Sequence, residues 1–367
     1  MGNSPDIGAV RAAAYDVPTD RPESDGTLAW KSTVLVVVEV DAGGKTGLGY
    51  TYAHQAVVPL VEGKLADVVT GRCALDVRAA WQAMVHEVRN LGATGVTAMA
   101  ISAVDAALWD LKARLLEQPL TTVLDAVHDS VPIYGSGGFT SYDDEQLAGQ
   151  LEGWVDEGIP RVKIKTGRDP GRDRHRLSVA RKAIGDDVEL FMDANGALSV
   201  RTGIEWAHIA RGEFGVRWFE EPVSSDDLDG LRAVREAAPG GIDIAAGEYG
   251  WNPWQLEAML AARAVDCLQI DTTRCLGITG FLTAAAAADA HQVDISAHCA
   301  PQISAQVCTA VRRLRHLEYF HDHTRIESML FDGVLPVEAG GVLRPDRSRP
   351  GHGLTFKRAD ADRFRVA

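Results

Sequence analysis

The sequence is poor in positive charge. Its 367 residues include 37 Lys and Arg against 51 Asp and Glu, which leaves a net charge of −14. Nucleic acids and anionic membranes attract clustered positive charge, so a chain this acidic is not expected to bind either of them. The composition is otherwise that of a globular protein, with 46% hydrophobic and 24% charged residues. The chain can therefore bury a large core.

Cysteines and long apolar runs are also scarce. The cysteines are odd in number and lack Cys-x-x-Cys spacing, which argues against a disulfide framework and against a thiolate zinc site. They are Cys73, Cys267, Cys275, Cys299 and Cys308. No apolar run approaches the roughly 20 residues of a membrane span, and residues 1–10 lack the basic start and apolar core of a secretory signal. We therefore expect a soluble, cytoplasmic protein.

The first 125 residues combine a strand hairpin with helices. Residues 30–40 (WKSTVLVVVEV) are rich in Val, and a glycine-containing turn leads from them to a returning arm that begins at 47–50. Apolar residues then recur at helical spacing over 101–115, and this pattern stops at Pro119. Residues 1–125 are therefore predicted to form an α+β domain.

After about residue 130, short apolar strands alternate with helices. Asp169-Pro170 and Asn252-Pro253 mark two helix starts, because each puts a capping residue before a proline at the first helical position. Strands separated by helices pair in parallel, and eight such units close into a barrel. The eight predicted strands lie at 131–135, 161–165, 188–193, 216–220, 243–248, 267–271, 293–298 and 316–320. Residues 126–320 are predicted to form the barrel domain, and residues 321–367 to return to the first domain.

One ionisable residue lies at the end of each of seven consecutive predicted strands. These residues follow one another at intervals of 20 to 28 positions, once per βα unit. In a barrel of parallel strands, all the carboxyl ends open at the same mouth, where catalytic groups gather. The seven residues are Lys165, Asp193, Glu220, Glu248, Asp271, His298 and Glu318.

Three of these residues, Asp193, Glu220 and Glu248, come from successive strands, so their carboxylates should converge. Carboxylates held together repel one another unless a cation neutralises them. All-oxygen ligands suit a hard divalent ion, and Mg²⁺ accepts few carboxylates while keeping positions for water or substrate. The sequence therefore predicts an Mg²⁺ site. The alternative is a set of three separately paired structural acids.

Bases flank the three acids on both sides. Lys163 lies two residues before Lys165 on the same strand face, and its ammonium is expected to lower the pKa of Lys165 so that Lys165 can act as a base. On the other side, Asp271 can orient His298 and raise its basicity. The alternatives are a solvated strand end for the lysines and a satisfied core histidine for His298.

Together these motifs resemble the enolase superfamily, mandelate racemase subgroup. The likeness rests on KIK, MDAN, FEEP and GE in this order, then on Asp and His one βα unit apart and Glu on the last strand. The segment ISAVDAALWDLKAR (101–114) is also similar to the helix that ends the family's first domain. The resemblance implies a modified TIM barrel of the (β/α)7β type with an N-terminal α+β capping domain. It also implies Mg²⁺ and the abstraction of a proton α to a carboxylate.

By the same likeness, each candidate residue has an implied role. Asp193, Glu220 and Glu248 resemble the Mg²⁺ ligands. Lys165 and the Asp271–His298 dyad resemble the two bases. Lys163 and Glu318 resemble the groups that help to hold the carboxylate and the enediolate, and Asn195 resembles a substrate contact.

The predicted reaction is dehydration of a sugar acid to a 2-keto-3-deoxy acid. Lys165 or His298 would remove the C2 proton, and the other group would protonate the departing C3 hydroxyl. Racemisation or epimerisation of a 2-hydroxy acid begins with the same enediolate and stays open as the alternative. A non-catalytic sugar-acid-binding barrel is disfavoured, because binding does not require two opposed bases. The expected partners are a small carboxylic acid and further copies of the chain in a homo-oligomer.

Substrate specificity is expected to come from loops of the first domain. Segments 18–28 and 47–56 are the candidates for a lid. The run Gly44-Lys45-Thr46 suggests a P-loop, but that motif needs glycine at position 39, where this chain has Glu39, so we predict a hairpin turn. His321 and His323 follow the eighth strand, and we favour a surface or substrate-facing loop for them over a metal site.

Overall fold

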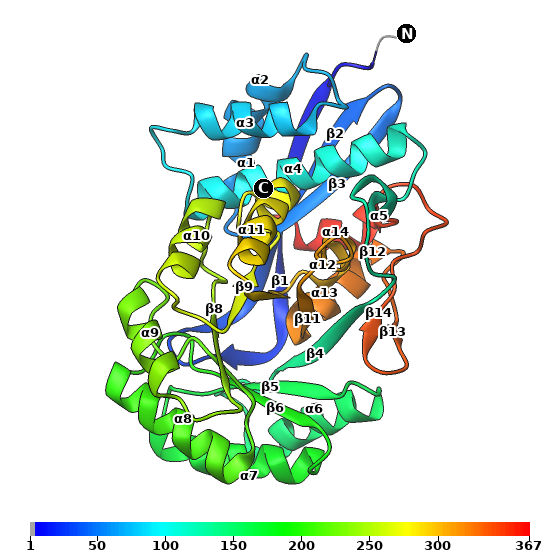
Figure 1. The fold of residues 1–367 in the computed structure, drawn as a ribbon. Coiled ribbons are helices and arrows are strands. Elements are labelled where there is room, and N and C mark those ends of the chain that lie inside the picture. The colour runs from blue at the N-terminus through cyan, green and yellow to red at the C-terminus, as the bar shows by residue number, and fades with distance from the viewer. Residues whose placement is uncertain (1–3) are drawn as a thin grey trace.

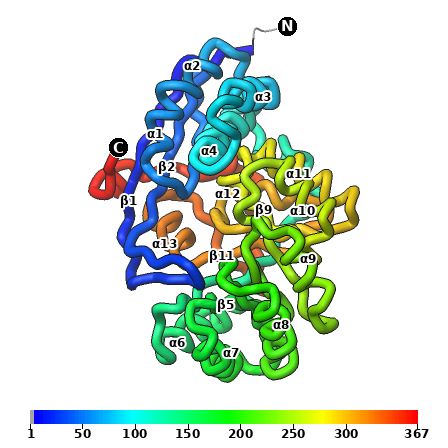
Figure 2. Tube along the Cα trace, turned by 90° about the vertical axis from the view of Figure 1, so that its left-hand side faces the viewer, coloured from blue at the N-terminus to red at the C-terminus, as the bar shows by residue number. Residues whose placement is uncertain are grey.

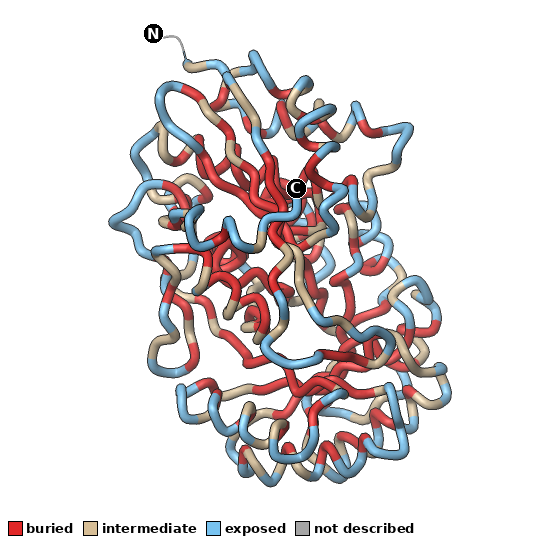
Figure 3. Tube along the Cα trace, turned by 180° about the vertical axis from the view of Figure 1, so that it is seen from behind, coloured by how far each residue is buried: buried red, intermediate tan, exposed pale blue. Residues whose placement is uncertain are grey.

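The computed structural model describes residues 4–367. An antiparallel sheet with its helices forms the upper part of the molecule in Figure 1, and a closed ring of parallel strands surrounded by helices lies below it. Buried residues run through the strands of both parts, whereas the helices expose their outer faces (Figure 3). The structure confirms the predicted α/β barrel with an N-terminal cap. The exact domain limits at 125 and 320 stay predictions.

The cap sheet consists of β1 (Ala9–Ser24), β2 (Ala29–Ala42) and β3 (Lys45–Tyr52), in that order. β2 and β3 form the predicted hairpin, in which Ala42 pairs with Lys45. The two loop residues, Gly43 and Gly44, have φ values of 56° and 74°. Positive φ at both positions is the geometry of a type I′ turn, which glycine adopts without steric cost. The run from Gly44 to Thr46 is therefore part of a hairpin and not a P-loop.

β1 is a cap strand that the sequence pattern does not predict. It is rich in Ala and contains Pro18 and Pro22, and these residue types are depleted in strands. It nevertheless pairs with β2 along most of its length, with a register shift between Pro18 and Glu23. The ladder with β2 overrides the weak local preference. Much of the segment 18–28 is consequently strand, and only its end forms the turn into β2.

The cap helices lie against this sheet. They are α1 (Val57–Leu60), the π-helix η1 (Val61–Leu65), α2 (Ala66–Val69), α3 (Val77–Glu87), α4 (Gly95–Leu115) and α5 (Leu120–Val123). α4 packs closely on β3, because a Cβ at Gly47 or Gly49 would lie 2.2 Å from a carbonyl oxygen of α4. Among residues 4–367, no helix is both long enough and apolar enough to cross a membrane.

The barrel contains all eight predicted strands. They are β4 (Val131–Gly137), β5 (Arg161–Lys165), β6 (Glu189–Asp193), β7 (Trp218–Glu220), β8 (Asp243–Ala246), β9 (Cys267–Ile270), β10 (Asp294–Ala297) and β11 (Leu314–Phe320). Each strand pairs in parallel with the next, and β11 pairs with β4 to close the ring.

The connecting helices surround this ring (Figure 1). They are α6 (Asp144–Asp156), α7 (Pro170–Ile184), α8 (Val200–Phe214), α9 (Leu228–Ala237), α10 (Pro253–Ala261), α11 (Gly277–Ala290) and α12 (Pro301–Cys308). α7 and α10 begin as predicted: the side chains of Asp169 and Asn252 accept backbone N–H groups of the first turn, and a proline follows each. In the described chain, seven helices thus join eight strands, which is the (β/α)7β arrangement.

An aromatic layer fills the floor of the barrel. Tyr134, Phe191 and Trp218 point inward from β4, β6 and β7, and the rings of Phe191 and Trp218 stack with centroids 5.7 Å apart. Side chains two residues apart on a strand share a face. The next inward positions, Asp193 and Glu220, therefore lie directly above this floor, at the carboxyl ends of the strands.

The remaining chain packs against both parts of the molecule. It contains α13 (His321–Leu330), β12 (Phe331–Asp332), β13 (Val337–Glu338), β14 (Val342–Leu343), β15 (Thr355–Phe356), α14 (Arg358–Ala361) and η2 (Asp362–Phe364). β14 pairs with β4 of the barrel. The last residues reach the cap, where the Val366 N–H donates to the Ala14 carbonyl at 2.9 Å, and Figure 2 shows this C-terminal end beside β1.

Candidate active site

The register of the barrel strands sets three ionisable side chains in one row. Lys165 pairs with Asp193 across β5 and β6, and Asp193 pairs with Glu220 across β6 and β7. Residues in register on neighbouring parallel strands project their side chains to the same side. Glu248 lies two residues beyond the end of β8 and completes the group. The sequence prediction that these side chains converge is therefore consistent with the strand register.

Three carboxylates meet at the centre of this site. One carboxylate oxygen from each of Asp193, Glu220 and Glu248 lies within 4.8 Å of the other two, and all three residues are buried. Burial, and then the charge of Asp193, raise the pKa of Glu220 to about 8. Glu248 Oε2 is buried without a hydrogen-bond partner, although His298 Nε2 lies 3.2 Å away. An orphaned oxygen in an all-carboxylate group fits a hard divalent cation.

Lys163 lies below the row and forms ion pairs with carboxylates from two strands. Its Nζ is 2.5 Å from Glu220 Oε1 and 2.7 Å from Glu318 Oε1. Ser136 Oγ donates to the same Glu318 oxygen at 2.5 Å. Burial alone would lower the pKa of Lys163, but the charges of Glu220 and Glu318 raise it well above its ordinary value. Lys163 is therefore held as a cation.

Lys165 stands nearer the mouth, with its Nζ 2.5 Å from Asp193 Oδ2. Burial lowers its pKa most strongly and Lys163 lowers it as well, but the carboxylates around it, Asp193 first, together raise it by more. The net pKa lies above the ordinary value for lysine. Lys163 lowers the pKa of Lys165 as predicted, but the negative charge of the surrounding carboxylates outweighs this effect, so the net shift does not favour the neutral amine.

His298 and Asp271 form the predicted dyad. The His298 Nδ1 lies 2.6 Å from Asp271 Oδ2, while Asp271 Oδ1 accepts the N–H and the hydroxyl of Thr273. Burial alone would lower the pKa of His298, but nearby negative charge and the Asp271 hydrogen bond raise it well above its ordinary value. The cap supports this dyad, since Thr51 Oγ1 donates to the Thr273 carbonyl at 2.8 Å. The arrangement holds the imidazole in one orientation with Nε2 toward Glu248.

A cavity of about 520 Å³ opens above these groups, between barrel and cap. Lys165 and His298 both line it. The segments predicted as a lid contribute as well, with Asp25 and Leu28 from the first of them. The rest of the cap lining comes from β2, β3 and the residues that follow, and consists of Trp30, Ser32, Thr33, Val34, Tyr52, Ala53 and His54.

Asn195 reaches this cavity from the loop after β6. Its backbone N–H donates to Asp193 Oδ1 at 2.8 Å, and its φ of 46° turns the chain sharply at this point. The side-chain Oδ1 has no hydrogen-bond partner in the described protein. The amide is therefore available to a ligand in the cavity.

Several further residues around the site belong to no motif that identified them in the sequence. Glu221, the second acid of the FEEP motif, is buried with an unpartnered oxygen, and burial and then Glu248 raise its pKa well above the ordinary value. Arg274 contacts both Glu248 and Asp271 at 3.4 Å. Tyr249 lies beside it, with the Arg274 guanidinium 5.3 Å from the ring centroid. Their adjacency to predicted site residues was the only signal in the sequence.

The two histidines after β11 lie on a helix rather than on the predicted loop. His323 is buried and lines the cavity. His321 does not line it, and its Nε2 lies 3.1 Å from Asp20 Oδ2. A carboxylate of Glu23 lies near this pair, so the three residues form a further group with metal-ligand atoms.

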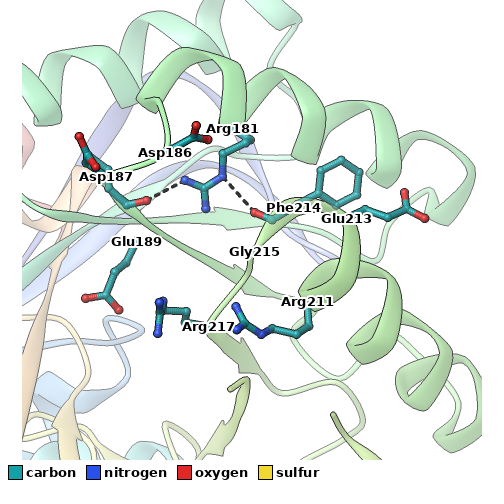
Figure 4. Close-up of a pocket in the computed structure, with 10 residues that line it drawn as sticks. Arg181, Asp186, Asp187, Glu189, Arg211, Glu213, Phe214, Gly215 and Arg217 are labelled. Carbon is teal, nitrogen blue, oxygen red and sulfur yellow. Dashed lines mark hydrogen bonds between the residues drawn. The ribbon is translucent and has the colours of Figure 1, made fainter. Parts of the chain in front are cut away.

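A second cavity, of about 600 Å³, lies at the opposite end of the barrel, where β6 and β7 begin. Figure 4 shows the side chains that line it. It is lined by Glu189 at the start of β6, by Arg217 just before β7, and by Arg181, which donates to the carbonyls of Val188 and Phe214. This end of a parallel barrel serves stability. The carboxylates and bases described above all lie at the other end.

Comparisons with known proteins agree with this arrangement. Residues 10–124 match the family described as mandelate racemase/muconate lactonizing enzyme, N-terminal domain, and residues 146–361 match the enolase C-terminal domain-like family. A solved mandelate racemase/muconate lactonizing enzyme-like protein from Rubrobacter xylanophilus is 53% identical with a TM-score of 0.96, over 99% of this chain and all of that one.

Two relatives with named activities are more distant. The 3,6-anhydro-alpha-L-galactonate cycloisomerase of Streptomyces coelicolor is 32% identical over 95% of this chain and 97% of that protein. The L-talarate/galactarate dehydratase of Salmonella typhimurium, solved with Mg and L-lyxarohydroxamate, is 25% identical with a TM-score of 0.90, over all of this chain and 94% of that one. The chain belongs to the mandelate racemase/muconate lactonizing enzyme family of the enolase superfamily.

Proposed function

We propose that this protein dehydrates a sugar acid to a 2-keto-3-deoxy acid after removing the proton at C2. The observation that carries the proposal is the placement of two different bases, Lys165 and His298, at one cavity with a carboxylate group between them. Both named relatives act on sugar acids or their anhydro forms, which supports the choice of substrate class.

Asp193, Glu220 and Glu248 would hold an Mg²⁺ ion, as the Mg-containing structure of the Salmonella dehydratase suggests. A divalent cation supplies positive charge that stabilises the dianion formed when a carboxylate loses its α-proton. Lys163 and Glu318 lie under the ligands and would help to hold the substrate carboxylate and the enediolate. Asn195, with its free amide oxygen, would contact a substrate hydroxyl.

Lys165 would take the C2 proton on its Nζ. Its amine must be neutral to do so, and the present contact with Asp193 favours the ammonium. When Asp193 ligates an ion, its charge is no longer available to retain that proton, and Lys163 then favours the neutral amine. Enzymes commonly adjust lysine bases in this way.

His298 would protonate the departing oxygen at C3. Asp271 lies on its Nδ1, so the imidazolium is stabilised and its Nε2–H points into the site. The C3–O bond breaks as the enediolate collapses, and the resulting enol becomes the 2-keto-3-deoxy acid. The proton taken by Lys165 and the proton given by His298 balance the loss of one water molecule.

Two other reactions share the first step. If His298 instead delivers a proton to C2 from the opposite face, the product is an epimer. If the departing oxygen belongs to a ring, the same elimination opens the ring and gives an isomer, which the 32% identity to a cycloisomerase favours as the second candidate. A non-catalytic binding barrel remains the least supported, because both bases are present. A homo-oligomer and a cytoplasmic location stay predictions.

The test is a screen of sugar acids, lactones and anhydro acids with Mg²⁺ in D₂O. Dehydration is expected to give a 2-keto acid together with one water per turnover. Ring opening is expected to give a 2-keto acid that is an isomer of the substrate. Deuterium at C2 without a keto product indicates racemisation or epimerisation. Turnover of no acid, and no exchange at C2 in any of them, contradicts the proposal.

A further inference from the structure

His323 occupies an unusual position for a residue outside the expected machinery. It lies in the first turn of α13, directly after the eighth barrel strand, and its side chain is almost entirely buried. It nevertheless lines the cavity that contains Lys165 and His298. Its neighbour two positions earlier, His321, does not line that cavity. Only the second histidine of the HDH motif can therefore meet a ligand there.

The His323 ring is held between aromatic residues from two parts of the chain. It stacks on the Tyr52 ring of the cap with centroids 3.4 Å apart and an interplanar angle of 7°. Phe320 meets it edge-on at 5.1 Å. The Tyr52 hydroxyl also donates to the His323 carbonyl at 3.3 Å. Because each contact comes from a buried residue, the ring cannot turn without disturbing the joint between cap and barrel.

The hydrogen bond at Nδ1 settles the tautomer. The backbone N–H of Ala300 lies 3.2 Å from His323 Nδ1, and a backbone N–H can only donate. Nδ1 must therefore be the acceptor, which leaves the proton of the neutral ring on Nε2. Burial, and then the nearby His298, lower the pKa of His323 well below its ordinary value. No group within residues 4–367 accepts a hydrogen bond from Nε2.

The surroundings of His298 and His323 therefore favour different protonation states. Asp271 on His298 Nδ1 favours the imidazolium, which can give a proton from Nε2. The Ala300 N–H on His323 Nδ1 favours the neutral ring, which can only donate from Nε2. When their surroundings push the pKa values of two titratable groups apart, the two groups take different roles. His323 is suited to holding an oxygen atom that must not change its protonation.

We propose that His323 is a specificity-determining residue whose Nε2–H donates to a hydroxyl or ether oxygen of the sugar acid beyond C3. This inference rests on the proposed function, in which Lys165 and His298 serve C2 and C3 and Lys163 with Glu318 serve the carboxylate. The remaining oxygens of a polyhydroxylated acid are those further along its chain. His323 therefore selects acids that carry an acceptor oxygen there over acids that lack it.

The experiment compares three variants for binding and turnover. His323→Phe keeps the aromatic stack on Tyr52 and removes the donor, His323→Gln keeps a donor, and His321→Phe is the matched control on the same helix outside the cavity. Each is titrated by calorimetry, with Mg²⁺ present, against a panel of hexonic acids and their single-deoxy analogues at C4, C5 and C6. Thermal unfolding of each variant verifies that the fold is retained.

His323→Phe is expected to bind the preferred acid about tenfold more weakly, the loss of one neutral hydrogen bond. It should bind one particular deoxy analogue as well as the wild type does. His323→Gln should recover part of the loss, His321→Phe should show none, and the pH profile of turnover should be the same in His323→Gln and the wild type. Residual exchange at C2 should persist in His323→Phe.

The outcomes separate this inference from the proposed function. An equal loss of affinity for every acid and every deoxy analogue in His323→Phe overturns the inference and leaves the function intact. A displaced pH profile in His323→Gln also overturns it, because a fixed donor does not titrate. Selective binding without any turnover or exchange in the wild type overturns the function and supports the inference. If no acid binds the wild type, both are overturned.

Discussion

The rim and the floor of this barrel come from the same strands, two residues apart, and differ in polarity and in their effect on stability. On β6 and β7, Phe191 and Trp218 form the floor, and Asp193 and Glu220 form the rim. The floor removes apolar rings from water and stabilises the fold. The rim gathers buried carboxylates that repel one another and so costs stability. The lesson is that one strand can supply both, because its side-chain period separates them by a single step.

The largest expected effect on turnover comes from the rim. In Glu248→Gln, one of the three proposed Mg²⁺ ligands loses its charge, so turnover should fall on the order of 10³-fold or more. Calorimetry should show a matching loss of Mg²⁺ affinity, and chelation should inactivate the wild type reversibly. Glu236→Gln, on the exposed face of α9, is the control. Full wild-type activity in excess chelator would contradict the metal assignment.

The next effect separates the two bases. Lys165→Ala should lose about 10² to 10⁴-fold in both C2 exchange and product formation, since the amine takes the C2 proton. His298→Asn should lose product formation to a similar degree and still exchange the C2 proton in D₂O. The measurement is NMR of deuterium at C2 against 2-keto product. Wild-type turnover in both variants would show that this cavity is not the active site.

A smaller effect is expected from loss of the hydrogen bond that joins the floor to the rim. Trp218 Nε1 donates to Glu220 Oε2 at 2.9 Å, so Trp218→Phe keeps most of the buried ring and removes this bond. Groups that orient a metal ligand typically contribute 10 to 100-fold in affinity, and we expect roughly that loss for Mg²⁺. Unchanged affinity, measured by titration, would mean that floor and rim are independent.

The floor itself should affect stability and leave the chemistry unchanged. Phe191→Ala removes a buried ring that stacks on Trp218, and the cavity left behind should cost about 3 to 5 kcal/mol of unfolding free energy. Turnover per folded molecule should remain near that of the wild type. The two quantities are measured by urea unfolding and by activity normalised to folded protein. If turnover fell sharply while the unfolding free energy stayed at the wild-type value, the floor would serve catalysis and not stability.

The smallest effect on turnover is expected from a buried carboxylate outside the rim. Asp105 of α4 accepts the N–H and the hydroxyl of Thr279 at the start of α11 and so joins cap to barrel. Burial raises its pKa from 3.8 to about 7, despite these hydrogen bonds. A carboxyl with a raised folded-state pKa stabilises the fold below its unfolded pKa, and this contribution is lost as the pH rises through about 7.

Asp105→Asn should lack this pH dependence. Relative to the wild type, its unfolding free energy should therefore increase as the pH rises from 4 to 8. Urea unfolding at several pH values measures this difference. Turnover should not change, because Asp105 does not line the cavity. A constant difference between the two proteins across this range would show that Asp105 stays charged in the fold.

Local patterns in the sequence predicted much of the architecture. The eight barrel strands, the hairpin of the cap, the two proline-marked helix starts and the convergence of Asp193, Glu220 and Glu248 all follow from short-range periodicity and from the rule that parallel strands end at one mouth. β1 escaped prediction, because its partner β2 decides its conformation more than its own alanines and prolines do.

The sequence by itself determined which chemical groups stand at the barrel mouth, since spacing along the chain controls which strand end each one occupies. Only the tertiary structure decided how these groups are charged and oriented. The pKa of Lys165 depends on carboxylates from other strands. The tautomer of His323 depends on the backbone N–H of Ala300, and the orientation of its ring on the stack with Tyr52. Protonation and hydrogen bonding respond to distances of a few ångströms between atoms. Such distances exist only after the chain has folded.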